Sequence, residues 1–262
     1  MRLRRTNSDD LLQLKSLWAL GFGDTQEEID AFFSLAYPDA LGFCAQEDGQ
    51  LLAACYAMPQ RIVCADGERQ AAYVYAVTTH PDFRRRGICA KLLGHAEKEL
   101  RKRYFDCMLL VPADEPLRRY YEALGFRSQC GTANMTFRAP EGRGVCRESS
   151  PQAYAGMRET LLGDVPHVQY SLTELRYQQS MSGLYQLELG MRMGCASAHV
   201  EGDTLLVEEI LPDSTLLPAL VKKLPAAVCR VRTAGGTEPF AMCKWLSDRA
   251  QPDDLYLAFD FG

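Results

Sequence analysis

Three arginines followed by a glycine lie in the stretch VTTHPDFRRRGICAKLL, residues 77–93, between an apolar strand pattern and an amphipathic helix pattern. A tight turn that leads into a helix exposes backbone N–H groups at the positive end of the helix dipole. Gly87 has no Cβ, so a ligand can approach the backbone closely, and Arg84, Arg85 and Arg86 add positive charge. The pattern predicts a site for an anion such as a phosphate, although the same residues would also suit an exposed, solvated turn.

Other phosphate-binding and metal-binding patterns are absent. The chain has no Gly-Lys pair, which the P-loop requires, and no G-x-G-x-x-G, which dinucleotide-binding folds require. Ten cysteines are present, but no two are spaced as C-x-x-C, and the four histidines are scattered. We therefore predict reduced, structural cysteines and no metal site.

Helices and strands that could position this turn are predicted on both sides of it. Apolar residues at helical spacing indicate helices over 9–20 and 88–100. Thr25 and Glu28 form a capping box that opens another helix, which ends at Tyr37-Pro38. Hairpin signals and apolar runs predict strands over 3–5, 42–46, 51–58, 61–65, 70–79, 107–111 and 134–137, with a further helix between Pro116 and Gly125.

The second half of the chain repeats this order of elements. Residues 139–150, APEGRGVCRESS, are rich in Pro, Gly, Ser and charge, as linkers are. Helices are expected over 151–162, 171–181 and 215–224, and strands over 184–189, 194–200, 204–211, 227–233, 240–246 and 255–261. We predict a first domain over 1–138, a linker over 139–150 and a smaller second domain over 151–262.

Composition limits the class of protein. With 262 residues, 47% of them apolar and 24% charged, the chain should form a packed globule. A net charge of -5 is unlike the basic balance of proteins that grip nucleic acid, so no nucleic-acid partner is expected. No apolar run reaches ~18 residues, and Asp9, Asp10 and Lys15 interrupt any signal-peptide core, so we predict a cytoplasmic protein with no membrane span.

The arginine turn resembles motif A of the GNAT N-acetyltransferase superfamily, whose pattern is V-x-x-x-P-x-x-[RQ]-x-x-G-x-[GA]. Val77, Pro81, Arg84 and Gly87 match this pattern. Cys89 stands where the family has Gly or Ala. Because Cys is small, we expect its amide to remain able to face a pyrophosphate.

A second signature of the family follows downstream. In the family, a buried strand is followed by N-x-x-A-x-x-[FLY]-Y-x-x-x-G-F, and this chain matches it over YYEALGF, residues 120–126. Asp114 and Leu117 replace the usual Asn and Ala. The resemblance covers residues 1–138 and implies an α/β (α+β) fold, with a mixed, mostly antiparallel GNAT sheet flanked by helices and a smaller GNAT-like domain after it. In that second copy, LPDSTLLPALVKKL takes the place of motif A without Arg or Gly, so it should not bind the cofactor.

The resemblance also implies acetyl-CoA as the acyl donor of an N-acetyltransferase. Its pantetheine would pair with the main chain of Val77 and Thr79, and an N–H such as that of Thr78 would stabilise the oxyanion. Tyr121 holds the family's general-acid position and would protonate the leaving thiolate, since a phenol of pKa ~10 and a thiol of pKa ~8.5 are well matched. The amides implied for the pyrophosphate are those of Arg85, Arg86, Gly87, Cys89 and Ala90.

The general base and the acceptor are left open by the sequence. The strand before the turn, AAYVYAVTTHP, contains no carboxylate. Asp24 and Glu27, between the first two helices, would suit a cationic amine, so a small-molecule amine is the expected acceptor. The oligomeric state is not predicted. Candidates for the base are water, His80, Glu208, Glu209, Asp260 and the terminal carboxylate of Gly262.

Two other classes of function remain open. A non-catalytic acyl-CoA-binding regulatory module would keep motif A without turnover, which the missing carboxylate permits and Tyr121 disfavours. A tRNA-dependent aminoacyl transferase would need a broad basic face, which the net charge of -5 disfavours.

Overall fold

The computed structural model describes residues 1–261, which divide into two compact units. Each unit is built from several segments of the chain. Unit 1 comprises residues 1–62, 68–127 and 242–251, and unit 2 comprises 63–67, 128–241 and 252–261. The expected domains 1–138 and 151–262 are continuous stretches of the chain, whereas the compact units are not. The expected domain boundaries therefore stay a prediction.

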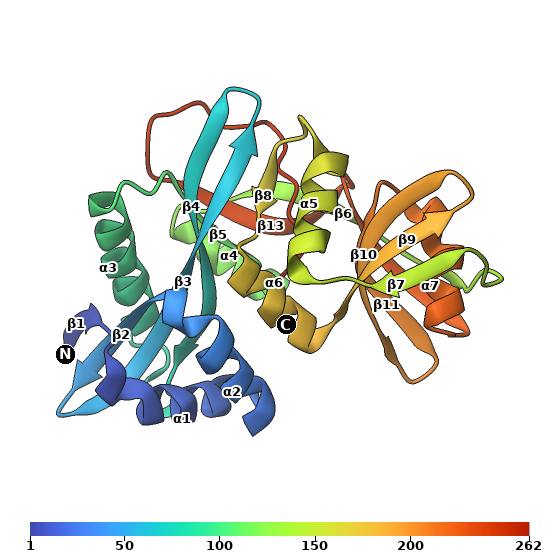
Figure 1. The fold of residues 1–262 in the computed structure, drawn as a ribbon. Helices are drawn as coiled ribbons and strands as arrows, with labels where there is room; N and C mark the ends of the chain where they lie inside the picture. Colours follow the sequence, from blue (N-terminus) through green and yellow to red (C-terminus); the bar gives the residue numbers. More distant parts are fainter. Residues whose placement is uncertain (262) are drawn as a thin grey trace. The chain divides into compact units, whose positions relative to one another are not determined.

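Unit 1 contains an open, mixed sheet with the strand order β1-β2-β3-β4-β5-β13 (Figure 1). Antiparallel pairing joins β1 to β2 and β2 to β3, whereas β5 runs parallel to β4. The second half of β13 pairs antiparallel with β5. The strands are β1 (Arg2–Arg5), β2 (Leu41–Glu47), β3 (Gln50–Cys64), β4 (Gly67–Thr79), β5 (Cys107–Leu110) and β13 (Glu238–Trp245).

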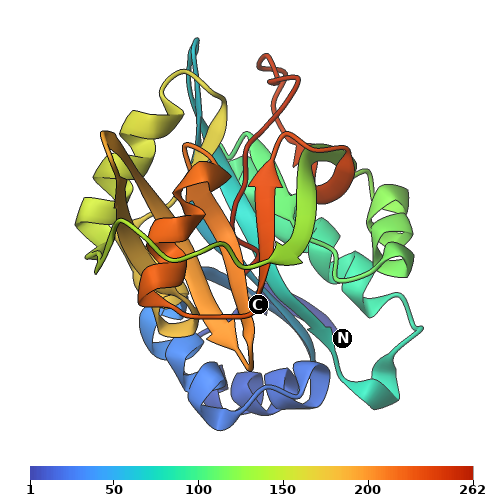
Figure 2. The same cartoon turned by 90° about the vertical axis from the view of Figure 1, so that its right-hand side faces the viewer.

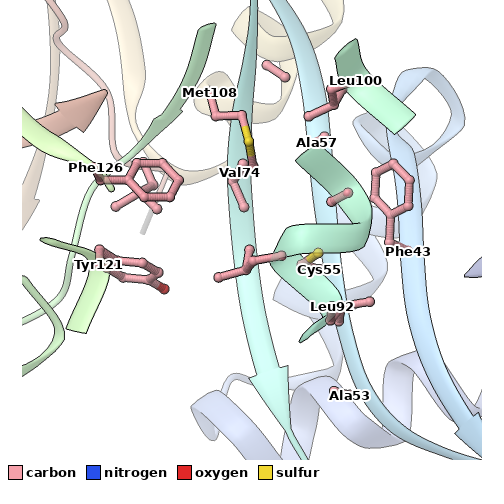
Figure 3. Close-up of a cluster of buried hydrophobic side chains, with 14 of the residues drawn as sticks. Phe43, Ala53, Cys55, Ala57, Val74, Leu92, Leu100, Met108, Tyr121 and Phe126 are labelled. Atoms are coloured by element: carbon pink, nitrogen blue, oxygen red, sulfur yellow. The ribbon is translucent and has the colours of Figure 1, made fainter. Parts of the chain in front are cut away.

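Helices cover both faces of this sheet, because successive side chains of its strands point to opposite sides. Cys55 and Ala57 of β3 pack beneath α3, together with Leu92 of that helix (Figure 3). Tyr56, between them in the sequence, instead contacts Trp18 of α1, with ring centroids 5.8 Å apart. The helices are α1 (Leu11–Phe22), α2 (Gln26–Leu35), α3 (Ile88–Lys102) and α4 (Glu115–Ala123).

Unit 2 repeats this arrangement, with the strand order β6-β12-β11-β10-β9-β7. Figure 1 shows α5 and α6 on one side of β9–β11 and α7 on the other, and Figure 2 shows α7 in front of these strands. The mostly antiparallel sheets flanked by helices confirm the predicted fold class. The elements are β6 (Arg127–Arg138), β7 (Val145–Glu148), α5 (Pro151–Leu162), β8 (His167–Gln169), α6 (Leu172–Met181), β9 (Gly183–Leu189), β10 (Arg192–Glu201), β11 (Thr204–Leu211), α7 (Leu217–Lys223) and β12 (Val228–Ala234).

Three local predictions differ from the structure. The two strands expected over 51–58 and 61–65 form the single strand β3, and the expected linker contains β7. Residues 255–261 are buried except for the half-buried Asp260, but they form no strand beyond a bridge at Tyr256. There, the Tyr170 hydroxyl accepts the main-chain N–H groups of Ala258 and Phe259, which takes the place of a sheet ladder.

No helix within residues 1–261 is both long and apolar enough to cross a membrane. The longest helix of unit 1, α3, has 15 residues and a polar face.

Candidate active site

Strand β4 loses its β5 neighbour halfway along its length. The parallel pairing covers residues 71–73 of β4, whereas the strand continues to Thr79. Ala76 has a φ of 46°, in the left-handed region, and it marks a bulge, because Val74 and Val77 both contact the core beneath α3 although they are three residues apart. The later part of β4 therefore offers main-chain N–H and C=O groups on its β5 side to an extended ligand.

The predicted anion site is a tight turn between β4 and α3. Arg84 Nε donates to the main-chain carbonyl of Thr79 at 3.2 Å, and Arg86 donates to that of Asp82 at 2.9 Å. The Arg86 guanidinium also lies over the Phe83 ring, 4.9 Å from its centroid. Two of the three arginines thus brace the turn, and their charge stays beside it.

Positive backbone φ angles at Arg85 and Gly87 shape the end of this turn, with values of 61° and 70°. A Cβ on Gly87 would meet nothing within 4 Å, so conformation, not space, favours glycine here. The first hydrogen bond of α3 runs from Lys91 N to Gly87 O at 3.2 Å. The N–H groups of residues 88–90 therefore have no acceptor within the helix, and they lie at the positive end of the helix dipole.

Cys89 turns its side chain toward the core. The thiol shares a hydrogen bond with the Tyr120 hydroxyl on α4 and packs against the cluster beneath α3. Burial raises the pKa of the Cys89 thiol, so this group stays protonated. The replacement of Gly or Ala by Cys thus adds a core contact and does not place a side chain over the Cys89 amide.

Tyr121 lies on α4 with only 7% of its side chain exposed. Its ring centroid is 5.7 Å from that of Phe126, and Figure 3 shows the hydroxyl pointing from α4 toward β4. Burial, with a contribution from Cys89, raises the pKa of the Tyr121 phenol, so its match to the pKa of a thiol is less close than the ordinary value of ~10 implies. Asp114, which replaces the family's Asn, caps α4 by accepting the Leu117 N–H at 2.7 Å.

Thr78 directs its side chain toward α1 and is 6% exposed. A Cβ on Gly21 of α1 would lie 2.7 Å from Thr78 Cγ2, so these two residues are in close contact. The Thr78 hydroxyl oxygen is buried without a hydrogen-bond partner in residues 1–261. The Thr78 side chain therefore faces α1, and the oxyanion role expected of its main-chain N–H stays a prediction.

The candidate bases lie in different surroundings. His80 Nδ1 accepts the Asp82 N–H at 3.3 Å and so caps the turn. Glu208, Glu209 and Asp260 belong to unit 2. Glu209 is fully buried and accepts hydrogen bonds from Arg158, Tyr154 and Tyr256, whereas Asp260 pairs with Arg232 and Glu208 with His199. The Gly262 carboxylate lies outside the described residues.

The acidic residues near α2 have local roles. Asp24 accepts the indole N–H of Trp18 at 2.7 Å, and Glu28 completes the predicted capping box with Thr25. Glu27 is exposed in the first turn of α2. Of the two residues expected to attract a cationic amine, Glu27 keeps its carboxylate in solvent.

Sequence reasoning did not identify an aromatic cluster beside the bulge. Trp18 of α1 contacts Tyr75 of β4 with ring centroids 5.6 Å apart, and Phe32 of α2 contacts Tyr75 at 5.5 Å. Tyr75 immediately precedes Ala76 and is half-buried. The alternation of Tyr73 and Tyr75 in AAYVYAV was the available signal, because it marks the sheet face opposite α3.

Side chains of His, Cys, Asp and Glu within residues 1–261 form no group of three or more that could hold a metal ion. The ten cysteines are free thiols, and seven of them are buried.

Comparison with family models gives a match to the first half of the chain. Residues 2–128 match the GNAT acetyltransferase domain. The chain therefore carries a GNAT acetyltransferase domain, and it is an acyltransferase of this type. The matched residues include β4, the arginine turn, α3 and α4, which are the elements of the candidate active site.

Solved structures extend the likeness of fold to nearly the whole chain. A GCN5-related N-acetyltransferase from Kribbella flavida is similar with a TM-score of 0.70 and 15% identity, over 92% of this chain and 70% of that one. One from Anabaena variabilis has a TM-score of 0.70 and 10% identity, over 94% and 73%. A tandem GNAT protein from the clavulanic acid biosynthesis pathway has a TM-score of 0.56 and 13% identity, over 95% and 99%. No curated protein matches the sequence.

Proposed function

We propose that unit 1 binds acetyl-CoA and transfers its acetyl group to a primary amine of a small molecule, by direct attack in a ternary complex. The observation that carries this proposal is the continuity of two binding features in the chain. The part of β4 that lacks a β5 neighbour is followed by one turn and then by α3. The first amides of α3 make no hydrogen bond within the helix, so they can donate to a ligand.

The residues present fit the two polar parts of this donor. The amides of residues 88–90, with those of Arg85, Arg86 and Gly87, offer N–H donors to a pyrophosphate at a helix N-terminus. Val77 and Thr79 lie beyond the bulge, where β4 can pair with the amide groups of the pantetheine as a strand would. Cys89 directs its thiol away from this surface.

The chemistry needs an oxyanion donor and a proton donor from the chain. Acetyl-CoA, when bound, supplies an acetyl group activated as a thioester. The Thr78 main-chain N–H stabilises the negative charge that develops on the carbonyl oxygen. That charge arises as the amine nitrogen forms the C–N bond, and Tyr121 then gives its phenolic proton to the sulfur as the C–S bond breaks. Water or His80 takes the proton that the amine releases, which returns to Tyr121 through solvent.

A small cationic amine is the acceptor that the charges favour. The net charge of -5 and the exposed Glu27 attract cations, and an amine must lose one proton before it can attack. Unit 2 has no arginine or glycine at the place of motif A, so one cofactor site per chain is part of the proposal.

Thermal unfolding and thiol release together test the proposal. At 100 times its Kd, acetyl-CoA should add about 2.7 kcal/mol, which corresponds to a rise in Tm of roughly 5–10 °C. Gly87→Glu, which places a side chain and a negative charge beside the amides, should abolish this shift. Gly190→Glu is the matched control, because Gly190 also has a positive φ, of 63°, and open space around it.

Turnover separates the enzyme from the alternatives. A panel of primary amines should include at least one that releases free CoA thiol with acetyl-CoA and the unaltered chain. A Tm shift without thiol release for any amine would favour the regulatory module. An unchanged shift in Gly87→Glu would overturn the cofactor site itself.

A further inference from the structure

Unit 2 contains a cavity of about 360 Å³ that acetyl transfer in unit 1 does not use. This volume is near the small end of the range for ligand pockets, roughly 300–1,000 Å³. The cavity is lined by strands β10, β11 and β12 and by the end of α6, including the buried Gln178 and Ser182. Its size is sufficient for a small polar ligand.

The strand register explains why charged side chains gather in this cavity. His199 of β10 pairs with Leu206 of β11, which pairs with Arg230 of β12. Residues two positions further along, Glu201 and Arg232, share this face of the sheet because side chains alternate along a strand. The intervening residues, such as Val231, pack under α7 on the opposite face. One face of these three strands thus carries several charged side chains around the apolar Leu206.

Two pairs of charges in the cavity neutralise each other. Glu208 accepts hydrogen bonds at 2.9 Å from His199 Nδ1 and at 2.8 Å from the Ser182 hydroxyl. Arg232 forms an ion pair with Asp260 at 2.8 Å. Because Ser182 and Glu208 both lie at Nδ1 of His199, these three residues are not arranged as a nucleophile, base and orienting acid.

Arg230 and Glu201 are left without ion-pair or hydrogen-bond partners in residues 1–261. Both side chains are exposed at the cavity and come from strands separated by β11. Strands two apart lie ~10 Å from each other, and Glu201 is level with Val228, two residues before Arg230, so the two side chains face the cavity diagonally with room for a small ligand between them. The cavity therefore presents the positive charge of Arg230 and the negative charge of Glu201, which acts on His199 only through space, as charges that a ligand can still pair with.

From these charges we infer that the unit 2 cavity binds a small zwitterion, of which an α-amino acid is the simplest kind. Its carboxylate pairs with Arg230 and its ammonium group with Glu201, while Ser182, Gln178 and Asn134 supply neutral hydrogen-bonding groups. A simple anion would leave Glu201 uncompensated and face three carboxylates. A simple cation would leave Arg230 uncompensated. This inference does not depend on the proposed acetyl transfer.

Ligand-observed NMR and calorimetry on the full chain test this inference. The probes are the twenty proteinogenic L-amino acids, added singly at millimolar concentration, followed for the tightest binder by its decarboxylated amine and its deaminated acid. We expect at least one amino acid to bind, and both truncated analogues to bind at least tenfold more weakly. Failure of every amino acid to bind would overturn the inference, as would equal binding of either analogue.

Variants locate the binding. Arg230→Met and Glu201→Gln should each weaken amino-acid binding tenfold or more. Arg138→Met is the matched control, since it removes an exposed arginine from the neighbouring strand β6 outside the cavity and should leave binding unchanged. Unaltered binding in both cavity variants would overturn the inference. The Tm shift with acetyl-CoA should persist in all three variants, so this result and the proposed function fail separately.

Discussion

Tyr121 lies in the hydrophobic core of unit 1 and also carries the proton that the proposed reaction needs. Burial keeps its phenol protonated, because the charged form loses solvation, and the same burial fixes the ring against Phe126. Tyr120, its neighbour, holds Cys89 and so links α4 to the first turn of α3. The two adjacent tyrosines therefore have separable roles.

Replacing Tyr121 by Phe should lower kcat by about 10²- to 10⁴-fold, the usual contribution of a general acid, with little change in KM for acetyl-CoA. The ring and its packing are retained, so Tm should change little. Rates of thiol release at saturating amine measure this effect. Tyr120→Phe is the control and should keep most of its activity. Full activity in Tyr121→Phe would assign the proton to water.

His199 offers a prediction about pH and stability. The hydrogen bond with Glu208, assisted by the charge of Glu201, raises the pKa of His199, while partial burial opposes this. A histidine whose pKa is raised by folding stabilises the folded state. This stabilisation is fully present at a pH below the pKa of the unfolded chain, about 6.5, and is lost as the pH rises through the pKa of the folded state. The Ser182 hydroxyl also faces the ring.

His199→Gln should therefore lower Tm relative to the unaltered chain at about pH 6, and the difference should shrink as the pH rises above the folded pKa. Thermal unfolding across this range measures the difference. A difference that is independent of pH would mean that His199 contributes only through packing.

At the scale of elements, local patterns were predicted well and distant pairings were not. The Thr25–Glu28 capping box and the helices α1 and α3 depend on residues that are close in the sequence, and the structure confirms all three. The 240–246 strand was also expected, but its pairing with β5 depends on contacts more than 130 residues apart in the chain. Hydrophobic alternation fixes a strand's faces, whereas it does not name the strand's neighbour.

The candidate site shows the same division. The arginine turn was predictable, because Gly87 and the helix that follows are adjacent in sequence. The bulge at Ala76 was not, since a positive φ at alanine has no local signal and is held by packing on both faces of β4. The end of β4 that lacks a β5 neighbour lies next to this bulge, and it can be recognised only in the structure.

The pairing of β13 with β5 predicts that residues 1–138 are not sufficient for a stable unit 1. All four residues of β5 are buried, and a 1–138 fragment would expose their main-chain edge where Met242–Trp245 pair in the full chain. Exposed edges of apolar strands promote aggregation. The fragment should unfold at lower temperature than the full chain, or aggregate.

Adding a peptide of residues 238–251 to this fragment should raise its Tm, because the peptide restores both β13 and the ion pair of Lys244 with Glu97 at 2.6 Å. Light scattering and thermal unfolding measure both effects. A fragment as stable as the full chain would instead support the domain boundary predicted from the sequence.

For the whole molecule, the two units share an architecture but differ at one turn. In unit 1 the turn before α3 is basic and its helix has 15 residues. In unit 2, Asp213 occupies the corresponding place and accepts the Thr215 N–H at 2.9 Å, so a carboxylate already satisfies this turn. A pyrophosphate there would meet a negative charge, and α7, with seven residues, has a shorter dipole.

One acetyl-CoA should therefore bind per chain, in unit 1. Isothermal titration calorimetry should give a single class of site with a stoichiometry near one, and Gly87→Glu should remove the whole binding signal, not half of it. Asp213→Asn, which removes the carboxylate charge but keeps a capping side chain, should not create a second site, because unit 2 still lacks the arginines and the glycine at this turn. A stoichiometry near two, or residual binding in Gly87→Glu, would show that unit 2 binds the cofactor despite Asp213, and the assignment of the arginine turn as the single cofactor site would then be wrong.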